Sequence, residues 1–338
     1  MNRKVRFGVI GAGRIGRLHV ENLTLRIPEA EVVAISDVSL PAAQKCAKDF
    51  GIPTVECDYH ALLDNPTIEA VLICSSTDTH AQIMVDAAAR GKQIFCEKPI
   101  AQDLGQIDKA LEAVRASGVK LQIGFNRRFD SNHLQVRKLV HEGKIGDPHI
   151  LRITSRDPAP PSMEYIKVSG GLFMDMMIHD FDLSRYLIGS EVVEVFAFGA
   201  VRIDPAIRKV GDLDTAVVSL KFENGAIGTI DNSRKAVYGY DQRVEVFGSK
   251  GMVQTFNKTP TSVWVSRSDG VIGDLPLHFF LERYGDSFVL EVREFINCLL
   301  DGTQPLVTGI DGKMSVKIAL AARLSYDQNR PAKVAEAY

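Results

Sequence analysis

Short apolar runs alternate with helical stretches over the first 125 residues. Five runs predict strands: Val5–Ile10, Glu31–Ser36, Ala70–Cys74, Gln93–Glu97 and Lys120–Phe125. The stretches between them carry apolar residues at helical spacing: Gly16–Leu25, Pro41–Phe50, Thr79–Arg90 and Gln106–Ser117. Because parallel strands are joined by crossover helices, this alternation predicts an α/β domain with a parallel sheet over residues 1–125.

The pattern changes after Phe125. Helical periodicity recurs at Val136–Gly143, Leu172–Leu187, Phe288–Leu300 and Gly312–Asn329. Most of the other apolar runs predict strands: His149–Ser155, Val192–Val201, Thr215–Phe222, Ala226–Asn232, Gln242–Phe247, Gly251–Phe256 and Ser262–Val265. Turn sequences separate many of these strands. Residues 126–338 are therefore expected to form an α+β domain with a large, mostly antiparallel open sheet.

A glycine motif lies where the first strand passes into the first helix. Gly11-Ala12-Gly13-Arg14-Ile15-Gly16 has the spacing and the context of a dinucleotide-binding loop. Gly11 permits the tight turn, Gly13 lets the backbone approach a pyrophosphate, and Gly16 lets the helix pack on the strand. These six residues predict a Rossmann domain that binds a cofactor. A glycine turn without a ligand and an FAD site are the alternatives.

Asp37 ends the second predicted strand, about twenty residues past the motif, where an acid bonds the hydroxyls of the adenosine ribose. Its charge would repel a 2′-phosphate, and neither Val38 nor Ser39 offers an arginine to bind one. The sequence therefore predicts NAD rather than NADP, with Val38 as a further cofactor-binding residue.

Two further strand ends carry polar residues at the edge where open parallel sheets bind ligands. They are Cys74–His80 and Cys96-Glu97-Lys98-Pro99. Lys98 is a candidate catalytic residue, and the alternative is a surface lysine paired with Glu97. The proline after it is a candidate for a cis peptide bond. The further residues expected to contact the cofactor are Ser75, Thr77, His80, Glu97, Lys98 and Asn126.

The predicted helix Leu172–Leu187 carries polar residues among apolar ones. If it is continuous, Asp175, His179 and Asp182 fall on one face. A histidine beside a carboxylate accepts a hydroxyl proton while the acid orients the ring and stabilises the imidazolium. The three side chains on this face are therefore expected to line a polar pocket. A structural histidine, or a metal held by the Asp–His pair without an evident third ligand, are the alternatives.

Composition and charge point to a globular protein with a small-molecule partner. The 338 residues are 45% hydrophobic and 24% charged, and the length suits two domains. A net charge of -2, with Lys and Arg spread along the chain, gives no field for nucleic acid or anionic lipid. No apolar run reaches the roughly 18 residues of a membrane span. Five cysteines without a CxxC pair, and no export signal, predict reduced thiols and a cytoplasmic location.

Three motifs together resemble one family along the whole chain. The Gly11–Gly16 loop, the Glu97-Lys98-Pro99 triplet and the Asp175-xxx-His179-Asp180-x-Asp182 pattern resemble, in this order, the Gfo/Idh/MocA oxidoreductases. In that family the lysine of the triplet and the helix Asp and His line the substrate site. The resemblance therefore implies catalytic roles for Lys98, Asp175 and His179. It also implies a homo-oligomer, a tetramer.

Further segments are similar to those of the inositol 2-dehydrogenases in this family. Gly124–Asp130 is similar to the loop that those enzymes place beside nicotinamide and substrate. Ser155–Pro158 and Tyr238–Asp241 resemble their polyol-contacting segments. Arg, Asp and Tyr supply the donors and acceptors that a ring of hydroxyls needs. The resemblance implies these substrate contacts: Lys98, Arg128, Arg156, Asp157, Asp175, His179, Asp182 and Tyr238.

Together these features predict NAD-dependent oxidation of a ring secondary alcohol of a polyol, with myo-inositol giving 2-keto-myo-inositol (scyllo-inosose). His179 is the candidate base and Asp175 orients it, while Lys98 donates to the reacting oxygen or relays a proton. The sequence does not decide between Lys98 and His179 as the base. Another inositol isomer or a pyranose sugar is the alternative substrate. An NAD-dependent glycosidase and a non-catalytic NAD sensor are the alternative functions.

Overall fold

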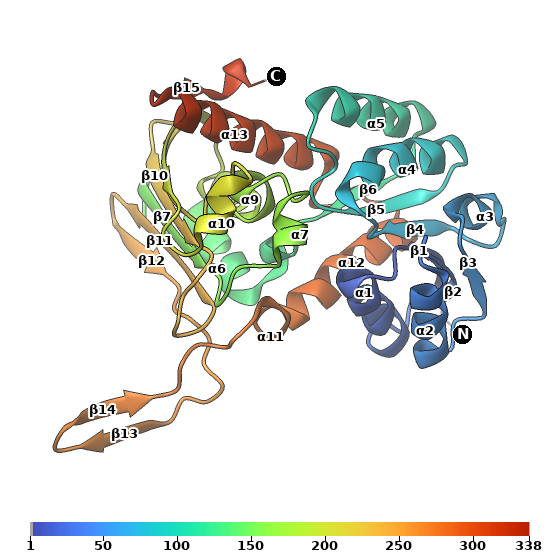
Figure 1. The fold of residues 1–338 in the computed structure, drawn as a ribbon, viewed down its shortest axis with the longest axis horizontal. Helices are drawn as coiled ribbons and strands as arrows, with labels where there is room; N and C mark the ends of the chain where they lie inside the picture. The colour runs from blue at the N-terminus through green and yellow to red at the C-terminus, as the bar shows by residue number, and fades with distance from the viewer. Residues whose placement is uncertain (1–2, 338) are drawn as a thin grey trace. The chain divides into compact units, whose positions relative to one another are not determined.

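The computed structural model describes residues 3–337, and the chain folds into two compact units (Figure 1). The first unit contains the chain up to Phe129 together with Asp286–Met314. The second contains Asp130–Gly285 and the residues from Ser315 onward. The sequence-based division after residue 125 differs from this, because it assigns the whole of Asp286–Met314 to the second domain.

The first unit is built on a parallel sheet with the strand order β3-β2-β1-β4-β5-β6. This is the order of doubly wound dinucleotide-binding folds, so the predicted Rossmann domain is confirmed. The strands are β1 (Val5–Ile10), β2 (Ala30–Ser36), β3 (Thr54–Glu56), β4 (Ala70–Ile73), β5 (Gln93–Glu97) and β6 (Leu121–Gly124). The α-helices are α1 (Arg14–Leu25), α2 (Leu40–Phe50), α3 (Tyr59–Asp64), α4 (Thr77–Ala89), α5 (Leu104–Ser117) and α12 (Gly285–Asp301).

Helix α12 joins this unit because its apolar face completes the core. Phe7 and Phe95 lie on central strands and are fully buried. The ring of Phe295 in α12 lies 6.5 Å from that of Phe7 and 6.0 Å from that of Phe95, centroid to centroid. Burying such a side chain contributes roughly 1.5–3 kcal/mol, and Val289, Val292 and Ile296 of the same helix lie in the same core.

The second unit is built on a seven-stranded sheet with the order β12-β11-β7-β10-β9-β8-β15. Only β7 and β10 among these neighbours are parallel, so the predicted mostly antiparallel sheet is confirmed. Its strands are β7 (Pro148–Arg156), β8 (Val192–Ala200), β9 (Thr215–Phe222), β10 (Ile227–Ser233), β11 (Asp241–Gly248), β12 (Gly251–Gln254) and β15 (Ala332–Lys333).

The seven-stranded sheet has one covered and one open face. Buried and exposed side chains alternate along β9, as expected for a sheet that is covered on one side. Helix α9 (Ile178–Ile188) lies on the covered face, where Asn232 Nδ2 donates to Asp180 Oδ2 over 2.9 Å. The open face exposes several large apolar side chains: Phe198, Val217, Ile227 and Phe247.

The prediction of one continuous helix over Leu172–Leu187 is wrong. The structure has a short helix α8 (Leu172–Asp175) followed by α9. The N–H groups of Met176 and Met177 both donate to the Leu172 carbonyl, over 3.1 and 3.0 Å, so a wider turn interrupts the regular hydrogen-bond ladder. Asp175 therefore precedes this break and His179 follows it.

The second unit has several further helices and a hairpin, of which only α6 and α13 are longer than about one turn. They are α6 (Ser131–His141), α7 (Met163–Ile166), α10 (Pro205–Lys209), α11 (Phe280–Arg283), α13 (Gly309–Gln328, which begins in the first unit) and the hairpin of β13 (Trp264–Arg267) and β14 (Gly270–Gly273). The hairpin extends away from the seven-stranded sheet (Figure 1). No helix within residues 3–337 has the length and hydropathy that a membrane span requires.

Candidate active site

The glycine loop joins β1 to α1 and is closed to any larger residue at two positions. Gly11 has a left-handed φ of +104°, and a Cβ there would lie 2.5 Å from the Cys74 carbonyl oxygen. A Cβ at Gly16 would collide with the Gly11 carbonyl. A Cβ at Gly13, in contrast, would meet nothing within 4 Å. The loop is therefore tightly packed on the protein side and open in front of the helix.

The first turn of α1 suits an anion. The helix begins at Arg14 after Gly13, and no side chain caps its N-terminus. The first N–H groups of a helix lack intrahelical partners and carry a partial positive charge, which favours a phosphate. The predicted cofactor residues Gly11, Ala12, Gly13, Arg14, Ile15 and Gly16 thus form a cradle that fits the pyrophosphate of a dinucleotide.

Asp37 lies beside this cradle. Its Oδ2 accepts a hydrogen bond from Ala12 N over 2.6 Å, and its Oδ1 accepts from Ser39 N over 2.7 Å. The neighbouring Val38 is 97% exposed. The ribose contact predicted for Asp37 stays a prediction, and a negative charge at this position would oppose a 2′-phosphate.

His80 connects the two polar strand ends of the first unit. Its Nδ1 lies 2.9 Å from the Pro99 carbonyl oxygen, and its Nε2 lies 3.0 Å from that of Ser75. Burial lowers the pKa of His80, although the two carbonyl contacts oppose this shift. Ser75 Oγ pairs with Thr79 Oγ1 at 2.7 Å. His80 thus fixes the loop that follows β4 against the Lys98–Pro99 segment, whose peptide bond is cis as predicted.

The carboxylate of Glu97 points into the protein. His19 Nε2 of α1 lies 2.6 Å from Glu97 Oε1. A Cβ at Gly124 would lie 3.0 Å from the Glu97 carboxyl, so glycine at the end of β6 makes room for it. This places Glu97 in a buried contact with His19, which speaks against a simple surface pair with Lys98.

Among the described residues, one group of three side chains could share a metal ion: His19, Glu97 and Glu291. Burial raises the pKa of Glu291 well above its usual value, and the negative charge of Glu97 raises it further. The same three side chains therefore form a buried group of coupled titratable residues.

Asn126 and Arg128 follow β6 in a short 3₁₀ helix, and both are buried. Asn126 Nδ2 donates to Ser287 Oγ over 3.2 Å. Arg128 Nη2 donates to Asp311 Oδ1 over 2.8 Å. The cofactor contact predicted for Asn126 and the substrate contact predicted for Arg128 stay predictions.

In the second unit, Asp175 is bound on both carboxylate oxygens. Tyr165 donates its hydroxyl to Oδ1 over 2.7 Å, and Arg234 Nη1 donates to Oδ2 over 3.2 Å. His179 lies in the first turn of α9, after the break. Asp182 is fully buried in α9, so a substrate contact for it stays a prediction that requires access to the interior.

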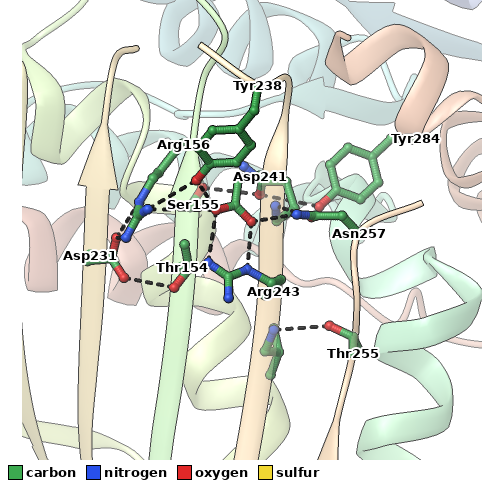
Figure 2. A network of polar contacts seen from close by, with 12 residues as sticks. Thr154, Ser155, Arg156, Asp231, Tyr238, Asp241, Arg243, Thr255, Asn257 and Tyr284 are labelled. Carbon is green, nitrogen blue, oxygen red and sulfur yellow. Dashed lines mark hydrogen bonds and ion pairs between the residues drawn. The ribbon is translucent and has the colours of Figure 1, made fainter. Parts of the chain in front are cut away.

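The predicted polyol-contacting residues Arg156 and Tyr238 belong to a polar network (Figure 2). Arg156 Nε donates to Asp231 Oδ1 over 2.7 Å, and its Nη1 donates to the Tyr238 hydroxyl over 3.1 Å. Tyr238 in turn donates to Asp241 Oδ2 over 2.6 Å. Asp231 alternates along β10 with Asn232, which faces α9, so Asp231 and Arg156 lie toward the open face.

Asp157 follows Arg156 in a loop held by backbone hydrogen bonds. Its N–H donates to the Ser233 carbonyl over 2.9 Å, and its own carbonyl accepts from Ala236 N over 2.6 Å. These bonds lead the chain from β7 and β10 toward Arg234. A substrate contact through the Asp157 side chain stays a prediction.

Three residues around Asp175 were not predicted from the sequence. Tyr165 and Arg234 bind its carboxylate, and Asp212 lies beside Arg234. Asp212 Oδ1 accepts from Leu172 N over 2.8 Å at the start of α8. The three residues come from separate segments, so no spacing rule connects them. The one available signal was a charged Arg234 directly after a strand pattern.

The glycine cradle on a doubly wound sheet defines the first unit as a nucleotide-binding fold. The catalytic roles of Asp175 and His179 in the second unit stay predictions. The chain belongs to the GFO/IDH/MocA family. Residues 5–125 match the family model described as an oxidoreductase family with an NAD-binding Rossmann fold, and residues 133–254 match the GFO/IDH/MocA C-terminal domain. The cofactor is therefore NAD.

Similar proteins cover the whole chain. The myo-inositol 2-dehydrogenase of Thermotoga maritima is 49% identical, over 98% of this chain and 99% of that protein. A crystal structure of a probable dehydrogenase from Thermotoga maritima has a TM-score of 0.97 and 48% identity, over 99% of this chain and 100% of that chain. The scyllo-inositol dehydrogenase of Lactobacillus casei, with bound NAD(H) and scyllo-inositol, has a TM-score of 0.93 and 31% identity, over 98% and 100% of the two chains.

Proposed function

We propose that the protein oxidises the C2 hydroxyl of myo-inositol with NAD to give 2-keto-myo-inositol. The observation that carries this proposal is the Asp175 carboxylate, fixed on both oxygens just before His179, in a chain whose other unit is an NAD-binding fold. The 49% identity to a myo-inositol 2-dehydrogenase supports this substrate.

Each predicted site residue has its own role in the proposed reaction. Bound NAD supplies the acceptor for the hydride that leaves the carbinol carbon. His179 takes the hydroxyl proton, and the negative charge of Asp175 stabilises the imidazolium that forms. Lys98 donates a hydrogen bond to the reacting oxygen, and it is the second candidate for the base. The polyol hydroxyls are assigned to Arg128, Arg156, Asp157, Asp182 and Tyr238.

A panel of polyols tests this proposal. The purified protein is mixed with NAD and with myo-inositol, scyllo-inositol or a pyranose, and NADH is followed by its absorbance. We expect the highest kcat/KM with myo-inositol, and mass spectrometry should show a product that has lost two hydrogens. The scyllo isomer is the second candidate, since a 31% identical relative is a scyllo-inositol dehydrogenase.

Other outcomes would contradict the proposal. Cleavage of a glycoside without net NADH would indicate an NAD-dependent glycosidase. Tight binding of NADH together with no turnover of any polyol would indicate a sensor.

The assembly is proposed to be a homotetramer. The open face of the seven-stranded sheet exposes Phe198, Val217, Ile227 and Phe247, and water-exposed apolar faces of this kind favour self-association. Light scattering after gel filtration should give four times the chain mass. Phe198→Asp should lower that mass, whereas Val38→Asp in the first unit should not.

The cytoplasm is the proposed location. The five cysteines are all free in the structure, and three of them are buried, which suits a reducing compartment. Fractionation of producing cells should recover the protein with cytoplasmic markers.

A further inference from the structure

Arg234 is a charge buried inside the second unit. It follows β10, and 1% of its surface is exposed. Its Nη1 donates to Asp175 Oδ2 over 3.2 Å, and its Nη2 lies 3.6 Å from Asp212 Oδ2. Removing a guanidinium from water is costly unless nearby carboxylates compensate its charge, and Asp175 and Asp212 are the two carboxylates beside it.

Asp212 connects the same guanidinium to the start of α8. Its Oδ1 accepts from Leu172 N, in place of the side-chain cap that Gly171 lacks. Gly171 has a φ of +84°, and a Cβ there would lie 2.7 Å from Asp212 Oδ1. The network around Arg234 therefore holds α8 at both ends, at Leu172 through Asp212 and at Asp175 directly.

Asp175 itself is clamped between two donors of different kinds. Tyr165 is about half exposed and binds Oδ1 from α7, whereas the buried Arg234 binds Oδ2. The turn between α8 and α9 is irregular and does not by itself fix a side chain. Arg234 is therefore the buried, charged donor among the groups that hold the Asp175 carboxylate.

We propose that Arg234 is a positioning residue for the reaction, which acts through Asp175 and contacts no substrate. This inference rests on the proposed polyol oxidation. Arg234 fixes the carboxylate in the one orientation in which its charge serves His179. A purely structural buried ion pair is the competing explanation, and the two differ in kinetics.

A double-mutant cycle separates the two explanations. The variants are Arg234→Met, Asp175→Asn and the two combined, with Arg234→Lys as the conservative replacement. We expect Arg234→Met to lower kcat/KM for the polyol about 100-fold, with NADH affinity unchanged because the cofactor cradle lies in the other unit. In the Asp175→Asn background the same change should cost less than about threefold. Lysine, which keeps the charge, should recover about tenfold of the loss.

Arg185→Met is the matched control. Arg185 is also a mostly buried arginine of the second unit, and it pairs with Glu191 over 2.6 Å rather than with Asp175. We expect this variant to melt at a lower temperature with little change in kcat/KM. If Arg234→Met does not fold, Arg234→Lys is measured in the wild-type and Asp175→Asn backgrounds, which completes the same cycle.

Two results would overturn the proposal. One is a near-normal kcat/KM in a folded Arg234 variant. The other is a fold-loss in kcat/KM from the Arg234 change that is equally large in the wild-type and in the Asp175→Asn background. A wild-type protein that oxidises no polyol contradicts the proposed function as well. An active wild type with independent losses contradicts only the role of Arg234.

Discussion

His19 Nε2 lies 2.6 Å from Glu97 Oε1, and this contact joins the helix of the glycine cradle to the strand that leads into Lys98. Glu291 Oε1 from α12 lies 4.0 Å from the same nitrogen, and its side chain is fully buried. Cys96 is buried nearby and Cys74 is partly buried, and desolvation raises the pKa of both thiols. These titratable groups therefore lie close to the ends of the parallel strands that carry the glycine loop and Lys98.

Glu291→Gln is expected to stabilise the protein at neutral pH. Burial holds the pKa of Glu291 well above its ordinary 4.5, so the folded state keeps a proton that the unfolded state releases. Stability from this group is therefore present below pH 4.5 and is lost as the pH rises toward the folded pKa, by about 1.4 kcal/mol per pH unit. Glutamine has no such proton to lose. Thermal melts should show a gain that grows from pH 4.5 upward.

The control for that experiment is Glu21→Gln, a change at an exposed glutamate of α1. Its melting temperature should follow that of the wild type at every pH. A Glu291→Gln effect that is the same at pH 5 and pH 8 would show that Glu291 does not hold the proton.

Asp37→Ser combined with Val38→Arg should move the cofactor preference toward NADP. The change removes the negative charge beside the cradle and adds a positive one at a position that is 97% exposed and free of packing constraints. We expect the ratio of kcat/KM for NAD to that for NADP to fall, and the change should correspond to a free-energy difference of about several kcal/mol in total. An unchanged ratio would mean that Asp37 is not the ribose ligand. Asp37→Ser alone should also weaken NAD binding, because Ala12 loses its acceptor.

Lys98→Met should separate binding from chemistry. A fluorescence titration should give the same Kd for NADH as in the wild type. Turnover should fall by about 10²–10⁴-fold, the usual contribution of an acid–base group. Lys48→Met, at an exposed site on α2, serves as the control and should keep full turnover. Near-normal turnover of a folded Lys98→Met protein would remove this lysine from the chemistry.

Arg283→Met should destabilise the second unit, most strongly at neutral pH. Arg283 Nη1 donates to Asp130 Oδ2 over 2.5 Å, and both side chains are buried. Although burial raises the pKa of Asp130, Arg283 and other nearby cations hold it below its usual value, so this stability is present above the ordinary aspartate pKa and is lost in acid. Removing one partner of a buried pair costs about 3–5 kcal/mol. In urea melts, the difference in the free energy of unfolding between wild type and Arg283→Met should shrink as the pH falls below the ordinary aspartate pKa. A difference that stays constant with pH would argue against the ion pair.

The candidate site shows how far spacing rules reach. The glycine cradle and Asp37 were found because their contacts follow from strand–loop–helix order within a single crossover unit. Asp175 and His179 were predicted to share one helix face, but the helical spacing assumed between them fails at the turn after Asp175. Periodicity cannot reveal such a break, because both segments are helical and apolar on either side of it.

The sequence by itself determined the two-part architecture, five of the six strands of the parallel sheet, the glycine cradle and the family motifs, because each is encoded by residues that are close together in the chain. The short strand β3 was not predicted. Only the tertiary structure decided that α12 completes the first core, that Glu291 meets His19 and Glu97, and that Arg234 holds Asp175. These contacts join segments far apart in sequence. They depend on how apolar faces pack and on which buried charges find partners, and no local pattern encodes either.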